Sequence, residues 1–435
     1  MRIGRNSQFD TTSISQNQLI EIAYMEYQAL GLLLWVIALY HIGCQLIGFV
    51  VIAPYISTSR WEDHFVPPAL VRPVNTVWFS WFQTASAYTN TGTSLVDQSM
   101  LPFQRAYPMI FLLIFLILAG NTCFPIFLRF FIWILSKMCK QDADLHKVLS
   151  FLLDHPRRCF LYLFPSHQTW FLLTVVILLT VLHMNHRSID WIFFLILDLG
   201  NVVLESIPVG VRVLDGLMQG IAVRAAGFAI VPLAALAPAV KVLYVIMMYI
   251  SVYPIAMSIR STNVYEEKSL GVFHSDERIE TREENFRHEG PRITVWSRYL
   301  AMHMKQQLAF DMWWIAISLF LLCIAESHHL TDPSKFEWFT IFNVLFELVS
   351  AYGTVGLSLG LPTNNYSFSG SFRGISKLII CAVMIRGRHR GLPVAIDRAV
   401  MFPREYQDSD SVEGFFEPAR ASKISHKNSH TYPII

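Results

Sequence analysis

The chain has 435 residues, of which 53% are apolar and only 15% are charged, and its formal net charge at pH 7 is +2. Soluble domains carry about 25% charged residues, so this deficit excludes an ordinary soluble enzyme or nucleic-acid-binding protein and indicates an integral membrane protein. The six cysteines form no CxxC pair, which argues against a disulfide framework or a zinc site. Because the chain also lacks a recognisable catalytic or nucleotide-binding motif in a suitable context, we predict no enzyme activity and no cofactor.

Six apolar stretches are predicted to cross the bilayer as helices, since spanning the hydrocarbon takes about 20 mainly apolar residues. In chain order they lie at 30–55, 107–135, 170–199, 233–259, 312–325 and 371–385. The polar segment 183–190 interrupts the third stretch, so one long tilted helix and two half-length pieces both remain open. The last two stretches are short for full spans, and amphipathic extensions on the cytosolic side would complete them.

Three shorter apolar stretches lie between these spans and end in glycine-containing loops, at 75–92, 213–227 and 337–356. Each is too short to cross the hydrocarbon as a helix. Irregular backbone survives at membrane depth only where it is buried in protein or lines a watery cavity. We therefore predict three re-entrant segments, each of which enters and leaves the membrane on one face.

The distribution of basic residues orients these segments. The loops 129–165 and 260–311 carry six and eight Lys or Arg residues, and such loops collect on the cytoplasmic side. Both termini are then cytosolic. The sequon at Asn365 falls on the outer side, where it is a candidate for glycosylation.

The three glycine-containing loops resemble one another and form an internal repeat. They read SAYTNTGTSL at 86–95, AVRAAGFAIV at 222–231 and SAYGTVGLSL at 350–359, with glycines separated by roughly 130 residues. A repeated unit of helix, re-entrant loop and helix, arranged around an axis, accounts for this pattern. Glycine visits φ > 0 without steric cost, and a ring of extended loop carbonyls can replace the hydration shell of a monovalent cation.

Three longer strings place the chain beside a known family. SAYGTVGLSLGLP at 350–362, IRGRHRGLPVAIDRA at 385–399 and SIRSTNVYEEKSLG at 258–271 resemble the fungal Trk-type potassium transporters of the wider Trk/Ktr/HKT superfamily. The resemblance runs from about residue 28 to residue 404. It implies four helix–loop–helix modules around one central cation pathway and K+ uptake driven largely by the membrane potential, with Na+ permeation left open.

The resemblance also assigns candidate site residues. It places the ion filter at Asn90, Thr91, Gly92, Ala225, Ala226, Gly227, Thr354, Val355 and Gly356, whose backbone carbonyls would hold K+. It matches Arg388 to an arginine that faces the pore beneath the filter, although a simple positive-inside anchor remains an alternative. It matches Lys377 to a lysine in the outer half of the same helix, about 16 Å away, so these two residues cannot act on one ion site.

Two further charged residues lie on the re-entrant segments and are functional candidates because an ionisable residue at membrane depth is costly. Arg224 either braces its loop through carbonyl groups or the carboxylate of Asp215, or contacts the ion path directly. A cation at close range would repel the transported ion, which favours the bracing role. Glu347 either pairs with Lys377 or adds negative potential at the pore entrance.

The sequence departs from the family pattern in two respects. Only three filter loops are present, and residues 1–28 cannot hold the family's first module and the hydrophilic segment that follows it. We therefore expect either a truncated chain or a non-conducting regulatory paralogue that assembles with a complete transporter. The middle loop also lacks the family's threonine around its glycine, which leaves the choice between K+ and Na+ open.

We thus predict an all-α, multi-pass protein of the plasma membrane built from repeated pore modules. Its parts are a cytosolic N-terminal segment (1–28), the second pore module (29–136), a cytosolic loop (137–168), the third module (169–260), a cytosolic loop (261–311), the fourth module (312–392) and a cytosolic tail (393–435). The expected partners are K+ and the lipid bilayer. A homo-oligomer remains open, and no nucleic acid is expected.

Overall fold

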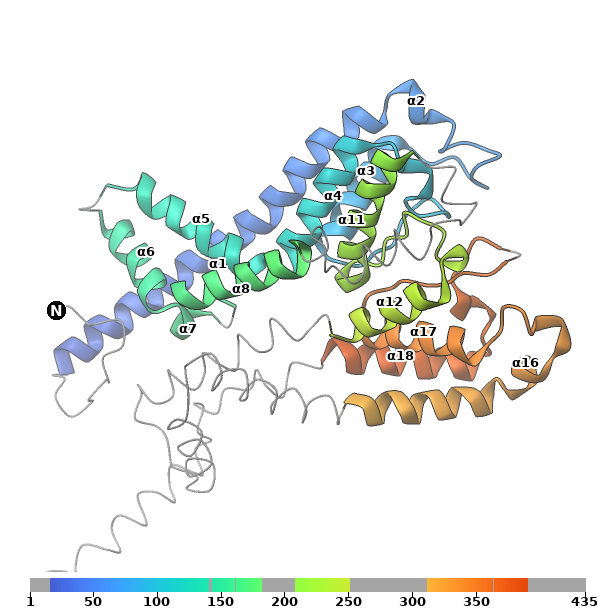
Figure 1. Ribbon diagram of the computed structural model, residues 1–435. Coiled ribbons are helices and arrows are strands. Elements are labelled where there is room, and N and C mark those ends of the chain that lie inside the picture. The colour runs from blue at the N-terminus through green and yellow to red at the C-terminus, as the bar shows by residue number, and fades with distance from the viewer. Residues whose placement is uncertain are drawn as a thin grey trace, which may run out of the picture. The chain divides into compact units, whose positions relative to one another are not determined.

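The computed structural model describes residues 16–140, 143–160, 162–181, 208–250, 311–362 and 364–389, and within these ranges it contains helices and no strand (Figure 1). The prediction of an all-α fold is therefore confirmed for the described part of the chain. All described residues belong to one compact unit, Met1–Val394. The predicted cytosolic tail 393–435, nearly all of the predicted loop 261–311 and the first part of the predicted N-terminal segment 1–28 lie outside the described residues.

The first half of the described chain contains α1 (Gln16–Ile56), α2 (Ser59–Glu62), α3 (Thr76–Tyr88), η2 (Leu101–Phe103), α4 (Tyr107–Gly120), α5 (Phe124–Met138), α6 (Asp144–Asp154), α7 (Pro156–Cys159) and α8 (Ser166–Val181). The second half contains α11 (Val209–Ala225), η3 (Leu233–Ala235), α12 (Pro238–Ile250), a helix over Asp311–Ala325, α16 (Ser327–Thr331), η4 (Pro333–Lys335), α17 (Ile341–Tyr352), η5 (Phe368–Ser371) and α18 (Gly374–Arg388). The elements named η are short 3-10 helices.

Helix α1 is 41 residues long, which corresponds to about 60 Å at 1.5 Å per residue. Within the described residues, its stretch Tyr24–Ile56 is the one helix long and apolar enough to cross a membrane by itself. Large apolar side chains are exposed along it, among them Leu34 at 69% and Trp35 at 75%. A patch of this kind is unfavourable in water, so the predicted span 30–55 agrees with the structure.

The predicted single span 107–135 is wrong in one respect, because the structure divides it into α4 and α5, which meet at 89°. The break follows Gly120. Pro125 lies in the first turn of α5, where its missing N–H and rigid ring are tolerated, whereas the same residue inside a continuous helix would clash with the preceding turn. Hydropathy alone does not report this change of direction.

The other predicted spans are only partly described. Helix α8 covers the first part of 170–199 and is described to Val181, so the question of one span or two pieces lies outside the described residues. Helix α12 covers the first part of 233–259. The helices Asp311–Ala325 and α18 correspond to the two short stretches 312–325 and 371–385.

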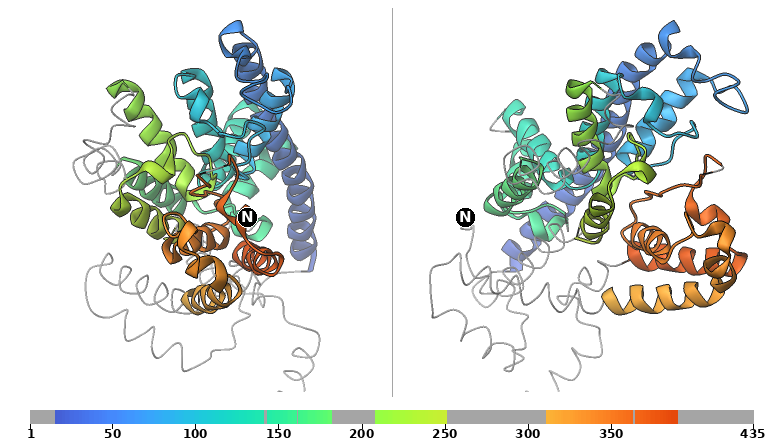
Figure 2. Two further views of the ribbon diagram at one scale, coloured as in Figure 1. Left: turned by 90° about the vertical axis from the view of Figure 1, so that its right-hand side faces the viewer. Right: turned by 45° about the vertical axis from the view of Figure 1, so that its right-hand side comes forward.

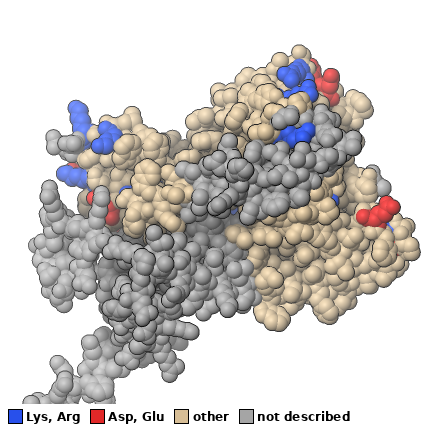
Figure 3. Space-filling model, viewed as in Figure 1, with Lys and Arg blue, Asp and Glu red and all other residues tan. Residues whose placement is uncertain are grey.

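The main hydrophobic core joins α1, α3, α4, α11, α12, α17 and α18 (Figures 1 and 2). Three phenylalanines pack within it, Phe65, Phe79 and Phe103, with ring centroids 4.8 to 5.7 Å apart. On the face shown in Figure 3, the charged side chains of the described residues gather near the margins. Most of the described surface between them is uncharged, as expected of a face that meets lipid.

A second, smaller core forms where the N-terminal half of α1 packs against α5 and α6. Its members are Ala29, Leu33, Val36, Leu128, Ile132, Val148, Leu149, Leu152, Cys159 and Leu163. Arg129 of α5 fastens this region, since its guanidinium donates to the carbonyl oxygens of Phe164 at 2.7 Å and Leu153 at 3.1 Å. These bonds satisfy one carbonyl group in the last turn of α6 and one just before α8.

Candidate functional site

Three short helices, α3, α11 and α17, lead into the three loops that repeat in the sequence. Side-chain caps begin two of them: the Asn75 carboxamide oxygen accepts from the N–H of Val77, and the Thr340 hydroxyl accepts from the N–H of Asn343. Each helix is followed by a glycine in the left-handed region. The φ angles are 75° at Gly92, 69° at Gly227 and 91° at Gly356, and side chains rarely tolerate this conformation.

These three glycines lie next to one another. A Cβ atom on Gly92 would overlap the carbonyl group of Ala226 and lie 2.8 Å from its carbon. A Cβ atom on Gly227 would likewise overlap the carbonyl group of Val355, at 3.0 Å from its carbon. On Gly356 a Cβ atom would meet the carbonyl oxygen of Thr91 at 3.4 Å, an ordinary van der Waals distance.

The three approaches form a closed cycle. In every case the glycine faces the carbonyl group of the residue that immediately precedes the glycine of the next loop. Loops that are far apart in the sequence thus meet at one place with their backbones in contact. The approach between the third and first loops is wider than the other two.

The first and third loops share one conformation, and the middle loop differs. Asn90 and Thr354, each two residues before its glycine, are also left-handed, with φ of 55° and 52°. No residue at the corresponding place in the middle loop has a positive φ, because α11 continues to Ala225. Gly227 therefore follows the helix end more closely than Gly92 and Gly356 follow theirs.

Backbone hydrogen bonds also distinguish the middle loop from the other two. The N–H of Thr91 donates to the carbonyl oxygen of Ser86, and the N–H of Val355 donates to the carbonyl oxygen of Ser350, both at 3.0 Å. In the middle loop the glycine itself makes this bond, since the N–H of Gly227 donates to Ala222 at 3.0 Å. The middle loop is thus one residue shorter than its two counterparts.

The middle loop is pinned by two glutamines that the sequence did not reveal. The N–H of Ile230 donates to the side-chain oxygen of Gln219 at 3.0 Å, and the Gln104 amide donates to the carbonyl oxygen of Ile230 at 2.8 Å. Gln219 belongs to α11, whereas Gln104 follows η2 and comes from the first repeat. No local pattern marks these residues, because the Gln219 bond depends on how the loop folds back onto α11, and the Gln104 bond joins segments that are distant along the chain.

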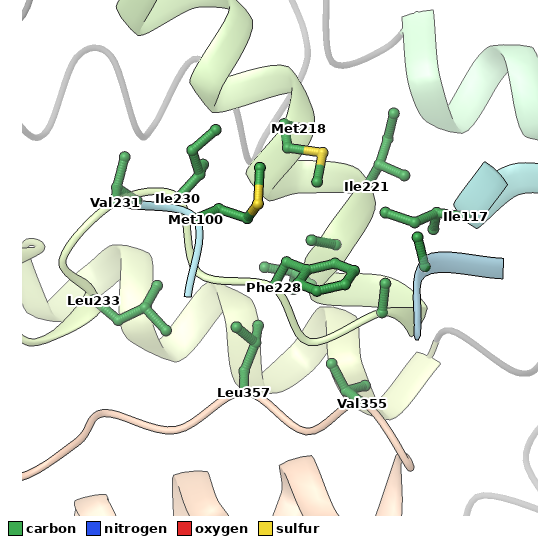
Figure 4. Close-up of a cluster of buried hydrophobic side chains, with 14 of the residues drawn as sticks. Met100, Ile117, Met218, Ile221, Phe228, Ile230, Val231, Leu233, Val355 and Leu357 are labelled. Atoms are coloured by element: carbon green, nitrogen blue, oxygen red, sulfur yellow. The ribbon is translucent and has the colours of Figure 1, made fainter. Parts of the chain in front are cut away.

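Apolar side chains also pack around the middle loop and hold it in place. Phe228 is fully buried and lies between Met218 of α11 on one side and Val355 and Leu357 of the third loop on the other (Figure 4). Met100 from the first repeat closes the same cluster. All three repeats therefore contribute side chains to the packing directly behind the meeting point of the loops.

The predicted bracing of Arg224 by Asp215 is not present. Asp215 is fully buried, and neither of its carboxylate oxygens makes a hydrogen bond with another described residue. Arg224 lies in the last turn of α11, partly buried, directly before the loop. The two residues are nine positions apart on one helix, which places them about 13 Å apart along its axis, too far for a direct bond.

The predicted pairing of Glu347 with Lys377 is also absent from the described residues. Glu347 is buried, and its carboxylate accepts from the backbone N–H of Ser369 at 3.2 Å. It therefore ties α17 to η5. Lys377, in the first turns of α18, is exposed, as is Arg388 in the last turn.

The glycosylation candidate Asn365 is exposed in the segment between α17 and η5. This exposure is compatible with modification of the sequon, which stays a prediction.

Comparison with known proteins adds independent information. The family model described as TrkH, cation transport protein, matches residues 1–409. The chain is 43% identical over 422 residues to the low-affinity potassium transport protein of Saccharomyces cerevisiae and 42% identical over 402 residues to the potassium transporter TRK1 of Candida albicans. It is 40% identical over 413 residues to potassium transport protein 1 of Schizosaccharomyces pombe.

These similarities cover nearly all of this chain but a minority of each relative. The matched share is 92%, 92% and 95% of this chain, against 46%, 36% and 46% of the respective relatives. The chain thus spans less than half the length of these curated relatives.

Proposed function

Because this chain belongs to the TrkH family of cation transport proteins, we propose that it forms part of a K+ pathway across the plasma membrane, with the ion filter where its three glycine loops meet. The observation that carries the proposal is the closed cycle of backbone approaches among Gly92, Gly227 and Gly356. Three relatives with about 40% identity are named as potassium transport proteins, which supports K+ as the ion.

The chemistry that we assign to these loops is replacement of hydration water. Backbone carbonyl oxygens of 90–92, 225–227 and 354–356 would surround a dehydrated K+ ion, as carbonyl rings do in other cation filters. The close backbone contacts support this role, because they hold carbonyl dipoles in place before the ion arrives. Because the middle loop is shorter, its carbonyl oxygens would lie at other positions around the ion than those of the other two loops. The relative passage of K+ and Na+ would depend on these positions.

The module boundaries 29–136, 169–260 and 312–392 follow from the same proposal. In the first, α1, α3 and α4 supply helix, half-helix and helix. In the last, the helix Asp311–Ala325, α17 and α18 have the same order. The middle module would combine α8, α11 and α12. The Lys and Arg residues of 137–168 and 261–311 favour the cytosolic side for these two loops, and with six spans both termini would lie on that side as well.

The test is Rb+ uptake in cells that lack K+ uptake of their own and express the full-length gene product that contains this chain. We expect growth at low external K+, and loss of both growth and uptake in Gly356→Arg, because the new side chain would fill the meeting point of the loops. Gly374→Arg is the matched control, since Gly374 has open space around it. Unchanged uptake in a Gly356→Arg protein that reaches the membrane would refute the filter assignment.

A further inference from the structure

Two of the three half-helices end against a glycine of the helix that follows them. Helix α17 ends at Tyr352, and a Cβ atom on Gly387 of α18 would overlap the carbonyl group of Tyr352, at 2.8 Å from its carbon. Helix α3 ends at Tyr88, and a Cβ atom on Gly120 of α4 would overlap the carbonyl group of Tyr88, again at 2.8 Å from its carbon. Any larger residue at these glycines would push the helix end away.

The two contacts occupy equivalent places. Each tyrosine is the last residue of its half-helix and lies four positions before the loop glycine, and each contacted glycine lies at the C-terminal end of the next long helix. The carbonyl groups in the last turn of a helix have no partner within that helix. Their position is therefore set by what they meet outside it.

Each tyrosine side chain also contacts the long helix that precedes its half-helix. The Tyr352 hydroxyl donates to the carboxylate of Asp311 at 2.6 Å, and both residues are buried. The Tyr88 ring packs against His41 and Tyr40, with centroids 4.9 and 6.4 Å away. The hydroxyl of Tyr40 in turn donates to Ala119, next to Gly120, at 2.9 Å. The half-helix end is thus clamped between the helices on both sides.

We infer that Gly120 and Gly387 are positioning residues that set how far the first and third loops reach into the ion path, and that they thereby control ion selectivity. This inference rests on the proposed function. A displaced helix end moves a loop that begins at the next residue, and sites that recognise a ligand by geometry lose their discrimination when they shift by about 1 Å. The closed cycle of loop contacts would pass such a shift to the neighbouring loop.

The chain provides matched controls for this inference. Gly374 lies on α18 with Gly387, and Gly43 lies on α1. At neither position would a Cβ atom come within 4 Å of another part of the described structure. Alanine is the better helix former, so Gly374→Ala and Gly43→Ala are expected to fold at least as well as the wild type. Gly387→Ala and Gly120→Ala introduce the same methyl group on α18 and α4, but against a backbone carbonyl.

The experiment compares these four variants in the full-length gene product by three measurements: surface level, the ratio of Rb+ to Na+ uptake, and amide hydrogen exchange of the loops 89–93 and 353–357. In Gly387→Ala and Gly120→Ala we expect the uptake ratio to change roughly tenfold, which is less than the roughly hundredfold loss that misplacement by about 1 Å can cause in a preorganised site. Exchange of the adjacent loop should become faster. Both controls should behave as wild type.

Gly387→Ala that reaches the surface with an unchanged uptake ratio and unchanged loop exchange would overturn the inference. If that variant does not fold, Tyr352→Phe decides, because it removes only the hydroxyl bond to Asp311. It should change the uptake ratio relative to wild type, and an unchanged ratio would overturn the inference. Absence of Rb+ uptake in the wild type would instead refute the proposed function. The exchange difference between Gly387→Ala and Gly374→Ala would still decide the positioning role.

Discussion

Replacing the three loop glycines by alanine one at a time should destabilise the protein by unequal amounts. Each glycine is left-handed, and an L-residue in that conformation costs about 1–2 kcal/mol. At Gly356 the new methyl group meets its nearest atom at 3.4 Å, so backbone strain is the main cost. At Gly92 and Gly227 it would lie 2.8 and 3.0 Å from carbonyl carbons, where carbon atoms prefer about 3.5–4.0 Å. The carbonyl oxygens lie closer still, so the loops must separate by at least about 1 Å, and overpacking of this kind adds about 1–3 kcal/mol.

The expected order of thermal stability in detergent is therefore wild type, then Gly356→Ala, then Gly227→Ala and Gly92→Ala as the least stable. Intrinsic tryptophan fluorescence during heating measures it. Gly43→Ala is the control and should match or exceed the wild type, because its surroundings are open and alanine favours the helix. Equal losses at all three loop glycines, or the largest loss at Gly356, would refute the reasoning that close backbone approach adds to conformational strain.

Three other predictions concern the framework around the loops. Arg129→Lys cannot bond both carbonyl groups that the guanidinium reaches, so the unfolding free energy should fall by about 1.5–3 kcal/mol, as a lower melting temperature with unchanged far-ultraviolet circular dichroism. Gln219→Leu leaves the buried N–H of Ile230 without its acceptor, which should cost about 1–3 kcal/mol and speed hydrogen exchange at that amide; equal exchange in variant and wild type would contradict this. Ser334 donates to Asp332 through its hydroxyl and N–H and holds the pKa of that carboxyl below its usual range. The stabilisation is complete above the unfolded pKa of about 4 and is lost as the pH falls through the lowered folded pKa, so acid should lower the melting temperature of wild type more than that of Asp332→Asn.

The hydropathy pattern and the internal repeat predicted much of the architecture, because both can be recognised within short stretches of sequence. The apolar run of α1 and the half-helices before the three loops could be read from the sequence, since each depends on a short stretch of residues. The meeting of Gly92, Gly227 and Gly356 also followed from the repeat. The turn between α4 and α5 did not, because Pro125 looks equally apolar in a straight or a bent helix.

The two predicted ion pairs that the described residues do not form concern partners across the fold, whereas the alternatives for Arg224 and Glu347 stay predictions. Charge alone suggested Asp215 as the ion-pair partner of Arg224 and Lys377 as that of Glu347. In the structure the carboxylate of Glu347 instead accepts a hydrogen bond from a backbone N–H of η5. Two groups of opposite charge can form an ion pair, but the rotation of each helix and the path of each loop decide whether the groups come close enough. The one-residue difference in the middle loop has the same origin, since it depends on where α11 ends.

Helix α1 has a mechanical consequence for the membrane. It runs without a break from the smaller core at Leu33 to the main core at Ile52. A change in the tilt of this helix would therefore move its contacts with both cores together. Its apolar stretch of 33 residues corresponds to about 50 Å, well beyond a hydrocarbon thickness of about 30 Å, and helices answer such mismatch by tilting. Bilayer thickness would thereby act on α1. Because an added Cβ atom on Gly48 would lie 2.9 Å from the methyl carbon of Thr84, α1 packs closely against α3, and the effect would reach the helix that leads into the first loop.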